Sequence, residues 1–239
     1  MENQEAEAFE KMALVDEVFK AGNIAVITGS SSGIGRAVAR RCAQLKMKVV
    51  LADVDEEELE EARAEVAALA DKPEDVFSQT TNVASAESLR VLQDMTWKKF
   101  GGCHFLMNNA GVGSGGGVLA PLSIWRSTID VNLWGPIHGC QAFLEPMQKF
   151  LGSGVGGLII NTGSKQGITM PPGNLVYNTS KAALKCFTEG LEHELRNVGA
   201  DGTQGEGAQP RLRAALLVPG WVNSSIALKA KRASLAGEL

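Results

Sequence analysis

Short apolar runs alternate with amphipathic stretches along most of the chain. Runs rich in valine, isoleucine and leucine predict strands at residues 23–28, 48–53, 76–82, 104–108, 157–163 and 212–218. Between them, apolar positions at helical spacing predict helices at residues 34–45, 55–70, 85–100, 121–151 and 174–197, the fourth broken near Gly135-Pro136. Strands that alternate with helices are typical of βαβ units. The pattern therefore predicts an α/β fold, with a doubly wound parallel sheet in a single domain.

The two ends of the chain differ from this central pattern. Residues 1–22 are acidic, and Phe9, Met12, Val15 and Phe19 predict an amphipathic helical extension before a domain at residues 23–239. We expect this helix to dock on its own domain, with docking on a partner as the alternative. The segment lacks a basic region and a long apolar run, so neither a signal peptide nor a transmembrane helix is predicted. Residues 199–210 are polar and glycine-rich, which favours a surface loop.

Composition narrows the possible partners. Of the 239 residues 44% are hydrophobic, which suits one sizeable core, and the net charge is −4 without a cluster of Lys or Arg. Nucleic acid and membrane are therefore not expected as partners. Four widely spaced cysteines without a Cys-x-x-Cys pair predict a reduced, cytoplasmic chain. The three histidines lack metal-ligand spacing, so no metal site is predicted.

A glycine-rich loop joins the first predicted strand to the helix that follows it. It reads Thr28-Gly29-Ser30-Ser31-Ser32-Gly33-Ile34-Gly35. In this setting Gly29 can form the tight turn, Gly33 lets backbone approach a pyrophosphate, and Gly35 lets helix and strand pack closely. The helix N-terminus adds N–H groups that favour an anion. The loop thus predicts a dinucleotide site, although many glycine-rich loops are plain turns.

Asp53 ends the second predicted strand, 18 residues after Gly35. This is close to the roughly 20 residues expected before a carboxylate that holds the adenosine ribose. A 2′-phosphate would meet the Asp53 charge at close range, and neither Ser32 nor Val54 supplies a compensating cation. The sequence therefore favours NAD as cofactor over NADP. Alternatively, Asp53 could cap the helix that begins near Asp55.

Tyr177 is the only tyrosine of the chain, and Lys181 follows it by four residues in a predicted helix. Side chains at this spacing share one face, so the ammonium group can stand beside the phenol. A nearby positive charge favours the phenolate and lowers a tyrosine pKa that is ordinarily near ~10. The pair predicts a tyrosine that transfers protons, but Tyr-x-x-x-Lys also arises by chance on amphipathic helices.

Four motifs, in their order over residues 23–224, resemble the short-chain dehydrogenase/reductase family in its single-domain form. They are the loop Thr-Gly-x-x-x-Gly-Ile-Gly, then Asn108-Asn109-Ala110-Gly111, then Val131-Asn132-Leu133, and finally Ser164, which lies 13 residues before Tyr177. The resemblance implies a Rossmann-like fold. It also implies an NAD-dependent oxidoreductase that interconverts a secondary alcohol and a ketone by hydride transfer.

The resemblance further implies roles for individual residues. Tyr177 would be the general acid/base, and Ser164 would orient the substrate oxygen. Lys181 would lower the pKa of Tyr177 and bind the nicotinamide ribose, while Asn132 would hold a water that links Lys181 to solvent. Asn82 stands where the family often has an Asp beside the adenine. The implied cofactor-binding residues are Gly29, Ser31, Ser32, Gly33, Ile34, Gly35, Asp53, Val54, Asn82, Val83, Asn109, Ala110, Gly111, Tyr177, Lys181, Pro219, Gly220 and Val222.

Family members also pair through two helices that correspond here to residues 133–151 and 174–197. These helices carry apolar residues at Phe143, Leu144, Met147, Leu184, Phe187 and Leu191. A homodimer or higher homo-oligomer is therefore expected, unless these side chains serve the core. Residues 167–176 are largely apolar, which favours a small, non-ionic substrate.

The sequence departs from the family pattern at its C-terminal end. Only 19 residues follow Gly220, where the family continues with a helical substrate lid, another helix and a seventh strand. The sheet should therefore stop at about six strands, with an exposed edge at residues 212–218. This departure favours an alternative function: a dinucleotide-binding protein, or a truncated product, with little turnover because the lid is missing.

Overall fold

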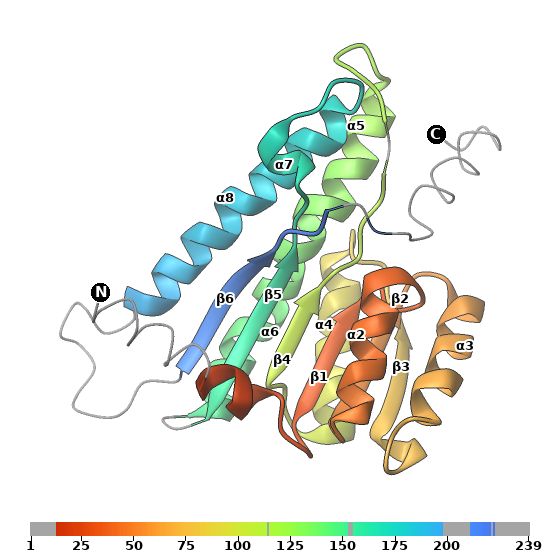
Figure 1. The fold of residues 1–239 in the computed structure, drawn as a ribbon, viewed down its shortest axis with the longest axis vertical. Helices are drawn as coiled ribbons and strands as arrows, with labels where there is room; N and C mark the ends of the chain where they lie inside the picture. The colour runs from red at the N-terminus through yellow and green to blue at the C-terminus, as the bar shows by residue number, and fades with distance from the viewer. Residues whose placement is uncertain (1–12, 114, 153–154, 198–210, 221, 223–239) are drawn as a thin grey trace.

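A parallel β-sheet forms the centre of the fold, and helices pack on both of its faces (Figure 1). The computed structural model describes residues 13–113, 115–152, 155–197, 211–220 and 222. In spatial order the strands are β3 (Val76–Thr80), β2 (Lys48–Asp53), β1 (Ile24–Thr28), β4 (Phe105–Asn108), β5 (Gly156–Thr162) and β6 (Arg211–Leu217). All neighbouring pairs are parallel. The predicted α/β fold with a doubly wound, Rossmann-like sheet of six strands is confirmed.

The strands form because their apolar runs are buried on both faces. All five residues of β1 and the four middle residues of β2 are buried, and continuous apolar runs are typical of parallel strands covered by helices. β3 was predicted to reach residue 82 but ends at Thr80. Two residues later the Asn82 carboxamide oxygen accepts the N–H of Ala84 at 3.0 Å, and this local turn directs the chain into the next helix.

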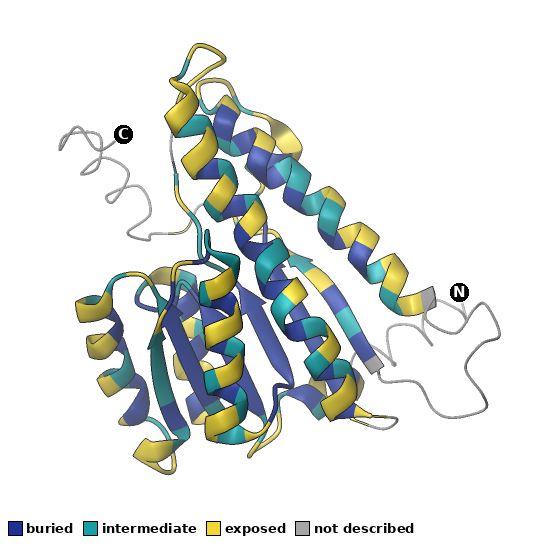
Figure 2. Cartoon of the chain, turned by 180° about the vertical axis from the view of Figure 1, so that it is seen from behind, coloured by how far each residue is buried: buried dark blue, intermediate teal, exposed yellow. Residues whose placement is uncertain are grey.

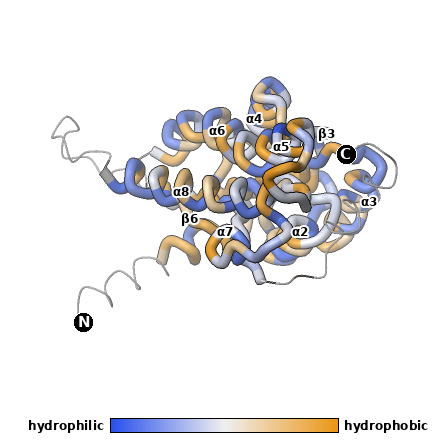
Figure 3. The backbone as a smooth tube through the Cα atoms, turned by 90° about the horizontal axis from the view of Figure 1, so that it is seen from above, coloured by the Kyte–Doolittle hydropathy of each residue, from blue (hydrophilic) through white to orange (hydrophobic). Residues whose placement is uncertain are grey.

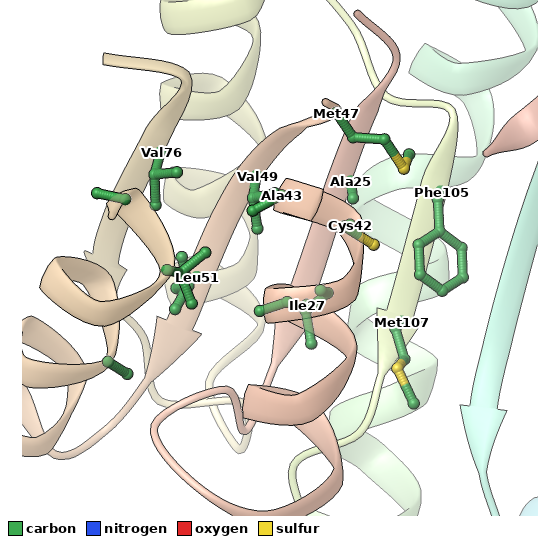
Figure 4. Close-up of a cluster of buried hydrophobic side chains, with 14 of the residues drawn as sticks. Ala25, Ile27, Cys42, Ala43, Met47, Val49, Leu51, Val76, Phe105 and Met107 are labelled. Carbon is green, nitrogen blue, oxygen red and sulfur yellow. The ribbon is translucent and has the colours of Figure 1, made fainter. Parts of the chain in front are cut away.

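The helices bury two separate cores, one on each face of the sheet. They are α2 (Gly33–Gln44), α3 (Glu56–Ala67), α4 (Ala86–Phe100), α5 (Leu122–Ile129), α6 (Gly135–Leu151), α7 (Gln166–Thr169) and α8 (Leu175–Asn197), with a 3-10 helix at Pro73–Asp75. One core, shown in Figure 4, joins α2 and α3 to strand residues such as Ala25 and Ile27. The other joins α4, α6 and α8 to residues such as Val26, and Figure 3 shows these three helices along one side of the sheet. Successive strand residues thus enter opposite cores.

The predicted break in the fourth helix takes another form. α5 runs into a π-helix, η2 (Asp130–Trp134), which continues as α6. The N–H of Gly135 donates to the carbonyl of Asp130, five residues earlier. Pro136 has no N–H, so it cannot donate to the carbonyl of Asn132, four residues earlier. The helix therefore widens instead of breaking, and π turns of this kind are frequent at functional sites.

Residues 13–18 form a helix that packs on the domain. Leu14 and Val18 are buried in the same core as α2, and the ring of Phe19 lies 4.9 Å from the ring of Phe105. The rest of the predicted N-terminal helix, residues 1–12, lies outside the described residues, as do the whole of the predicted loop at 199–210 and residues 223–239. Two described elements were not predicted: α7 and the 3-10 helix, both of which are short. No helix in the described ranges is long and apolar enough to cross a membrane.

The close packing of α6 on β4 generates a prediction about stability. A Cβ at Gly139 would lie 2.1 Å from the buried side-chain oxygen of Asn108, whereas a Cβ at Gly190 on α8 would meet nothing within 4 Å. Gly139→Ala should therefore lower the free energy of unfolding by about 1–3 kcal/mol or more, because the core has no room for it. Gly190→Ala should raise it by about 0.5–1 kcal/mol, because alanine favours a helix. Urea unfolding of both variants checks this, and equal effects would contradict it.

Candidate active site

The predicted site residues gather at the carboxyl edge of the sheet. Thr28, Asp53, Asn108 and Thr162 end β1, β2, β4 and β5. β1 and β4 are neighbours, and the strand order reverses between them. Open parallel sheets bind ligands at such a reversal. Figure 1 shows α5, α7 and the first turns of α8 extending beyond this edge.

The glycine loop has the close approaches that the sequence predicted. Gly29 has a φ of +64°, and a Cβ there would lie 2.7 Å from the Cα of Ala110. A Cβ at Gly35 would lie 2.3 Å from the carbonyl oxygen of Gly29. α2 begins at Gly33, with no acidic residue in its first turn and no capping hydrogen bond from the Ser32 side chain. The loop can therefore present backbone N–H groups to a phosphate.

Asn109 connects the loop to two strands. Its amide group donates to the carbonyls of Thr28 and Gly29, at 3.1 Å each, and its carboxamide oxygen accepts the hydroxyl of Thr162 at 3.2 Å. The Thr28 hydroxyl in turn accepts the N–H groups of Asn109 and Ala110. Asn109 is one of the implied cofactor-binding residues, and its side chain fixes the backbone around the site.

Asp53 lies at the junction of β2 and α3, beside the glycine loop. One carboxylate oxygen accepts the N–H of Ser31 at 3.1 Å and its hydroxyl at 2.7 Å, and the other accepts the N–H of Val54 at 2.8 Å. The alternative role as helix cap belongs to Asp55 instead, whose side chain accepts the N–H of Glu58 at 3.0 Å. The N–H of Asp55 also lies 3.4 Å from the second oxygen, so four donors hold Asp53 in one orientation. A ribose diol would replace the weaker of these contacts to reach the carboxylate.

Other predicted cofactor residues line the same edge. Val54 is exposed beside Asp53, and Asn82 is exposed with its carboxamide oxygen engaged in the turn to Ala84. Val83 is buried, and its carbonyl oxygen lies 3.1 Å from Nδ1 of His138. Pro219 and Gly220 follow β6, and the carbonyl of Pro219 accepts the N–H of Lys165, next to Ser164. Val222 is exposed.

The structure brings Ser164, Tyr177 and Lys181 together. Tyr177 and Lys181 lie on α8, and Ser164 follows β5. Burial raises the pKa of Tyr177, and a side-chain hydrogen bond with Ser164 opposes this effect. The Nζ of Lys181 lies 5.8 Å from the centre of the Tyr177 ring. Lys181 was expected to lower the pKa of Tyr177, but in this structure burial outweighs every other influence on the phenol.

Lys181 is an almost fully buried charge. Only 4% of it is exposed, and its Nζ donates to the carbonyl of Thr162 at 2.8 Å. Burial lowers the pKa of Lys181 to about 8. Sequence reasoning missed the role of Thr162, although its position two residues before Ser164 at a strand end is a usable signal.

Asn132 fastens the π-helix to the segment that follows β4. Its carboxamide oxygen accepts the N–H of Val112 at 2.8 Å, while its amide donates to the carbonyl of Val112 and to the hydroxyl of Ser180. A Cβ at Gly111 would lie 3.3 Å from this oxygen and 3.6 Å from Nζ of Lys181. Neither Val112 nor Ser180 was identified from the sequence, because neither carries a recognisable motif.

The described residues contain no group of three or more His, Cys, Asp or Glu side chains that could hold a metal ion. The polar groups at the sheet edge instead suit an organic ligand with phosphates and a ribose, because backbone N–H groups, a fixed carboxylate and a buried ammonium group all face that edge.

Comparison with known proteins agrees with this geometry. A family model described as short chain dehydrogenase matches residues 23–227. The protein named putative oxidoreductase SadH of Mycobacterium tuberculosis is 36% identical over 175 residues. These residues are 73% of this chain and 61% of that protein, so the chain spans less than two thirds of its relative.

Solved structures show the same fold. A short chain dehydrogenase/reductase from Burkholderia phymatum, in complex with NAD, is 38% identical with a TM-score of 0.78, over 89% of this chain and 70% of that chain. An alcohol dehydrogenase from the archaeon Thermococcus sibiricus, complexed with 5-hydroxy-NADP, is 26% identical with a TM-score of 0.71. The match covers 83% of this chain and 76% of the alcohol dehydrogenase chain.

The buried charge of Lys181 generates a prediction about pH. Between the folded pKa of about 8 and an unfolded value near ~10.4, the unfolded chain binds more protons, so stability should rise with pH in this window. Lys181→Met removes the buried charge and with it this pH dependence. The gain in free energy of unfolding of the variant over the wild type should be largest at pH 7 and should shrink as the pH rises from 8 to about 10.4.

Urea unfolding at pH 7 and pH 10 measures the difference. Lys185→Met is a matched control, because Lys185 is partly exposed and paired with Glu189 one turn later on α8. The same pH dependence in both variants would contradict the prediction.

Proposed function

Since the chain belongs to the short-chain dehydrogenase/reductase family of NAD(P)-dependent oxidoreductases, we propose that it interconverts a secondary alcohol and a ketone with NAD. The observation that carries the proposal is the grouping of three side chains: Ser164 is close enough to Tyr177 to oppose the rise in the pKa of the phenol, and the ammonium group of Lys181 lies beside the same ring. This group adjoins the glycine loop at one edge of the sheet, so a dinucleotide and a substrate can meet there.

The residues have complementary parts in the reaction. In the oxidation, the Tyr177 phenolate takes the proton of the alcohol hydroxyl, and Ser164 donates a hydrogen bond to the same oxygen. A nicotinamide bound at this edge would supply the acceptor for the hydride of the alcohol carbon, so that the ketone remains. Burial raises the pKa of Tyr177 and so disfavours the phenolate. The positive charge of Lys181 acts in the opposite direction, because it stabilises the phenolate. In the reduction, the same phenol gives its proton back to the alkoxide.

Asp53 supports NAD as the cofactor. Its carboxylate, fixed by Ser31, can accept the 2′- and 3′-hydroxyls of the adenosine ribose, whereas a 2′-phosphate would add a like charge beside it. The relative from Burkholderia phymatum was solved with NAD, and the alcohol dehydrogenase from Thermococcus sibiricus with 5-hydroxy-NADP. Fold alone therefore does not select the cofactor, and Asp53 is the residue that supports the choice.

Exposed apolar side chains near the site support a non-ionic substrate. The segment after β4 carries Val118, Leu119 and Leu122, which are 75%, 94% and 70% exposed. The segment between β5 and α8 carries exposed Ile168 and Met170. A single bridge between Gly116 and Asn174 joins the two segments, and no Asp, Glu, Lys or Arg occurs at residues 110–125 or 166–176. A charged substrate would find no counter-ion within these residues, and the nearest charges along the chain are Lys165 and Arg126 at their margins.

Tyr177→Phe should abolish turnover while cofactor affinity stays nearly unchanged, because the hydroxyl handles the proton and does not hold the dinucleotide. A set of secondary alcohols, screened with NAD and with NADP by the absorbance of the reduced cofactor, identifies a substrate first. Calorimetry then measures cofactor binding to both proteins. More than a tenth of wild-type activity in Tyr177→Phe would contradict the assigned role. NAD binding by the wild type without turnover of any alcohol would favour a dinucleotide-binding protein instead.

We also propose that the chain forms a homodimer through α6 and α8. Of the residues on which the sequence based this expectation, Phe143, Met147, Leu184 and Leu191 are buried within the monomer. A dimer would therefore have to use outward positions that include Leu144 and Phe187, which are only partly buried. Light scattering at micromolar concentration should give twice the mass of one chain, and a strictly monomeric mass would count against this interface.

A further inference from the structure

Two arginines lie beside the glycine loop, next to the carboxylate proposed to hold the ribose. Arg36 and Arg40 are four residues apart and share one face of α2. Nη1 of Arg36 donates to the carbonyl of Ser31 at 3.4 Å, and the hydroxyl of Ser31 donates to Asp53 at 2.7 Å. A single residue therefore links the guanidinium group to Asp53.

Glu65 on α3 engages both arginines. Its Oε2 accepts Nε of Arg36 at 2.7 Å and contacts Nη2 of the same group, while its Oε1 lies 3.0 Å from Nη1 of Arg40. The side chains of Arg36 and Glu65 are 30% and 34% exposed. An isolated ion pair of this exposure contributes about 1 kcal/mol or less to stability, and a network shared by two arginines can contribute more. The network therefore joins α2 to α3, and it also decides where the guanidinium group of Arg36 points.

The chemistry of arginine suggests another reason. Its planar guanidinium group pairs with phosphate through two parallel N–H groups. NADP differs from NAD by a phosphate on the adenosine ribose, at the 2′-oxygen that Asp53 would meet. Arg36 is close enough to Ser31 to favour that phosphate, but its Nε and Nη2 groups are directed to Glu65.

We propose that Glu65 is a residue that determines cofactor specificity: by holding Arg36, it prevents this guanidinium from pairing with a 2′-phosphate. Glu65 thereby reinforces the NAD preference that Asp53 sets. The inference rests on the proposed function, because it takes the glycine loop as a dinucleotide site. The acidic stretch that runs from the end of β2 into the first turn of α3 acts in the same direction, because its charges repel a phosphate. It comprises Asp53, Asp55, Glu56, Glu57 and Glu58.

Calorimetry on the folded chain tests the proposal without any turnover. The proteins are the wild type, Glu65→Gln, Arg36→Gln, the double variant Glu65→Gln/Arg36→Gln, and Glu61→Gln. Glu61 is the matched control, because it lies on α3 and forms no ion pair with either arginine among the described residues. The ligands are NAD, NADP, AMP and adenosine 2′,5′-bisphosphate, the last two because they isolate the adenosine end. Circular dichroism verifies that each variant is folded.

The wild type should bind NAD at least tenfold more tightly than NADP. Glu65→Gln should bind NADP and the bisphosphate at least fivefold more tightly than the wild type does, with the affinities for NAD and AMP within twofold. Arg36→Gln should remove most of this gain in the Glu65→Gln background but change little in the wild type. Glu61→Gln should alter every affinity less than twofold.

The outcomes distinguish the role of Glu65 from the proposed function of the chain. Equal effects of Glu65→Gln and Glu61→Gln, or a gain that persists in the double variant, would show that only net charge matters and would overturn the proposal for Glu65. In either case tight NAD binding would leave the proposed function standing. A wild type that binds neither dinucleotide would overturn both.

Discussion

The burial of the Lys181 ammonium group is the constraint on which the arrangement of the site depends. A buried charge needs a partner, and Nζ donates to the carbonyl of Thr162 at the end of β5. Because Lys181 lies one turn after Tyr177 on α8, this contact also fixes the phenol relative to the sheet. The hydroxyl of Thr162 donates to Asn109, whose amide holds the carbonyl of Gly29. Hydrogen bonds thus connect Lys181, and with it Tyr177, to the glycine loop.

A second row of polar contacts fixes α8 more deeply in the fold. The amide of Asn108 on β4 donates to the carboxamide oxygen of Asn161 on β5 at 2.9 Å, and the amide of Asn161 donates to the hydroxyl of Thr188 on α8 at 3.0 Å. All three residues are buried, and Gly139 leaves the room that Asn108 needs. Two rows of contacts along its length restrict both the tilt and the rotation of α8, which Figure 2 shows buried on its inner face.

The parts of the structure that the sequence predicted are those decided by local pattern. Apolar runs gave the six strands, and the spacing of Gly29 and Gly35 gave the loop, because a missing Cβ has a direct steric meaning. Spacing placed Lys181 near Tyr177, but the balance of effects on the phenol pKa depends on burial, which neighbours in sequence do not determine. The partners of Asn109 and Asn132 likewise come from distant segments. Helical periodicity placed Phe143 on an apolar face of its helix, but it did not show whether that face covers its own sheet or a partner; the structure shows Phe143 buried.

The site separates what must be rigid from what can vary. The half around the glycine loop is built from strand ends and a loop joined by hydrogen bonds, and the half around Tyr177 is fixed to β5 through Lys181. The apolar segments around Leu119 and Met170, by contrast, are joined to each other by one bridge between Gly116 and Asn174. Loops tolerate sequence change far better than the elements that carry them. Substitutions in these two segments can therefore change which substrate the proposed site accepts, while the hydrogen bonds around the glycine loop and Lys181 stay as they are.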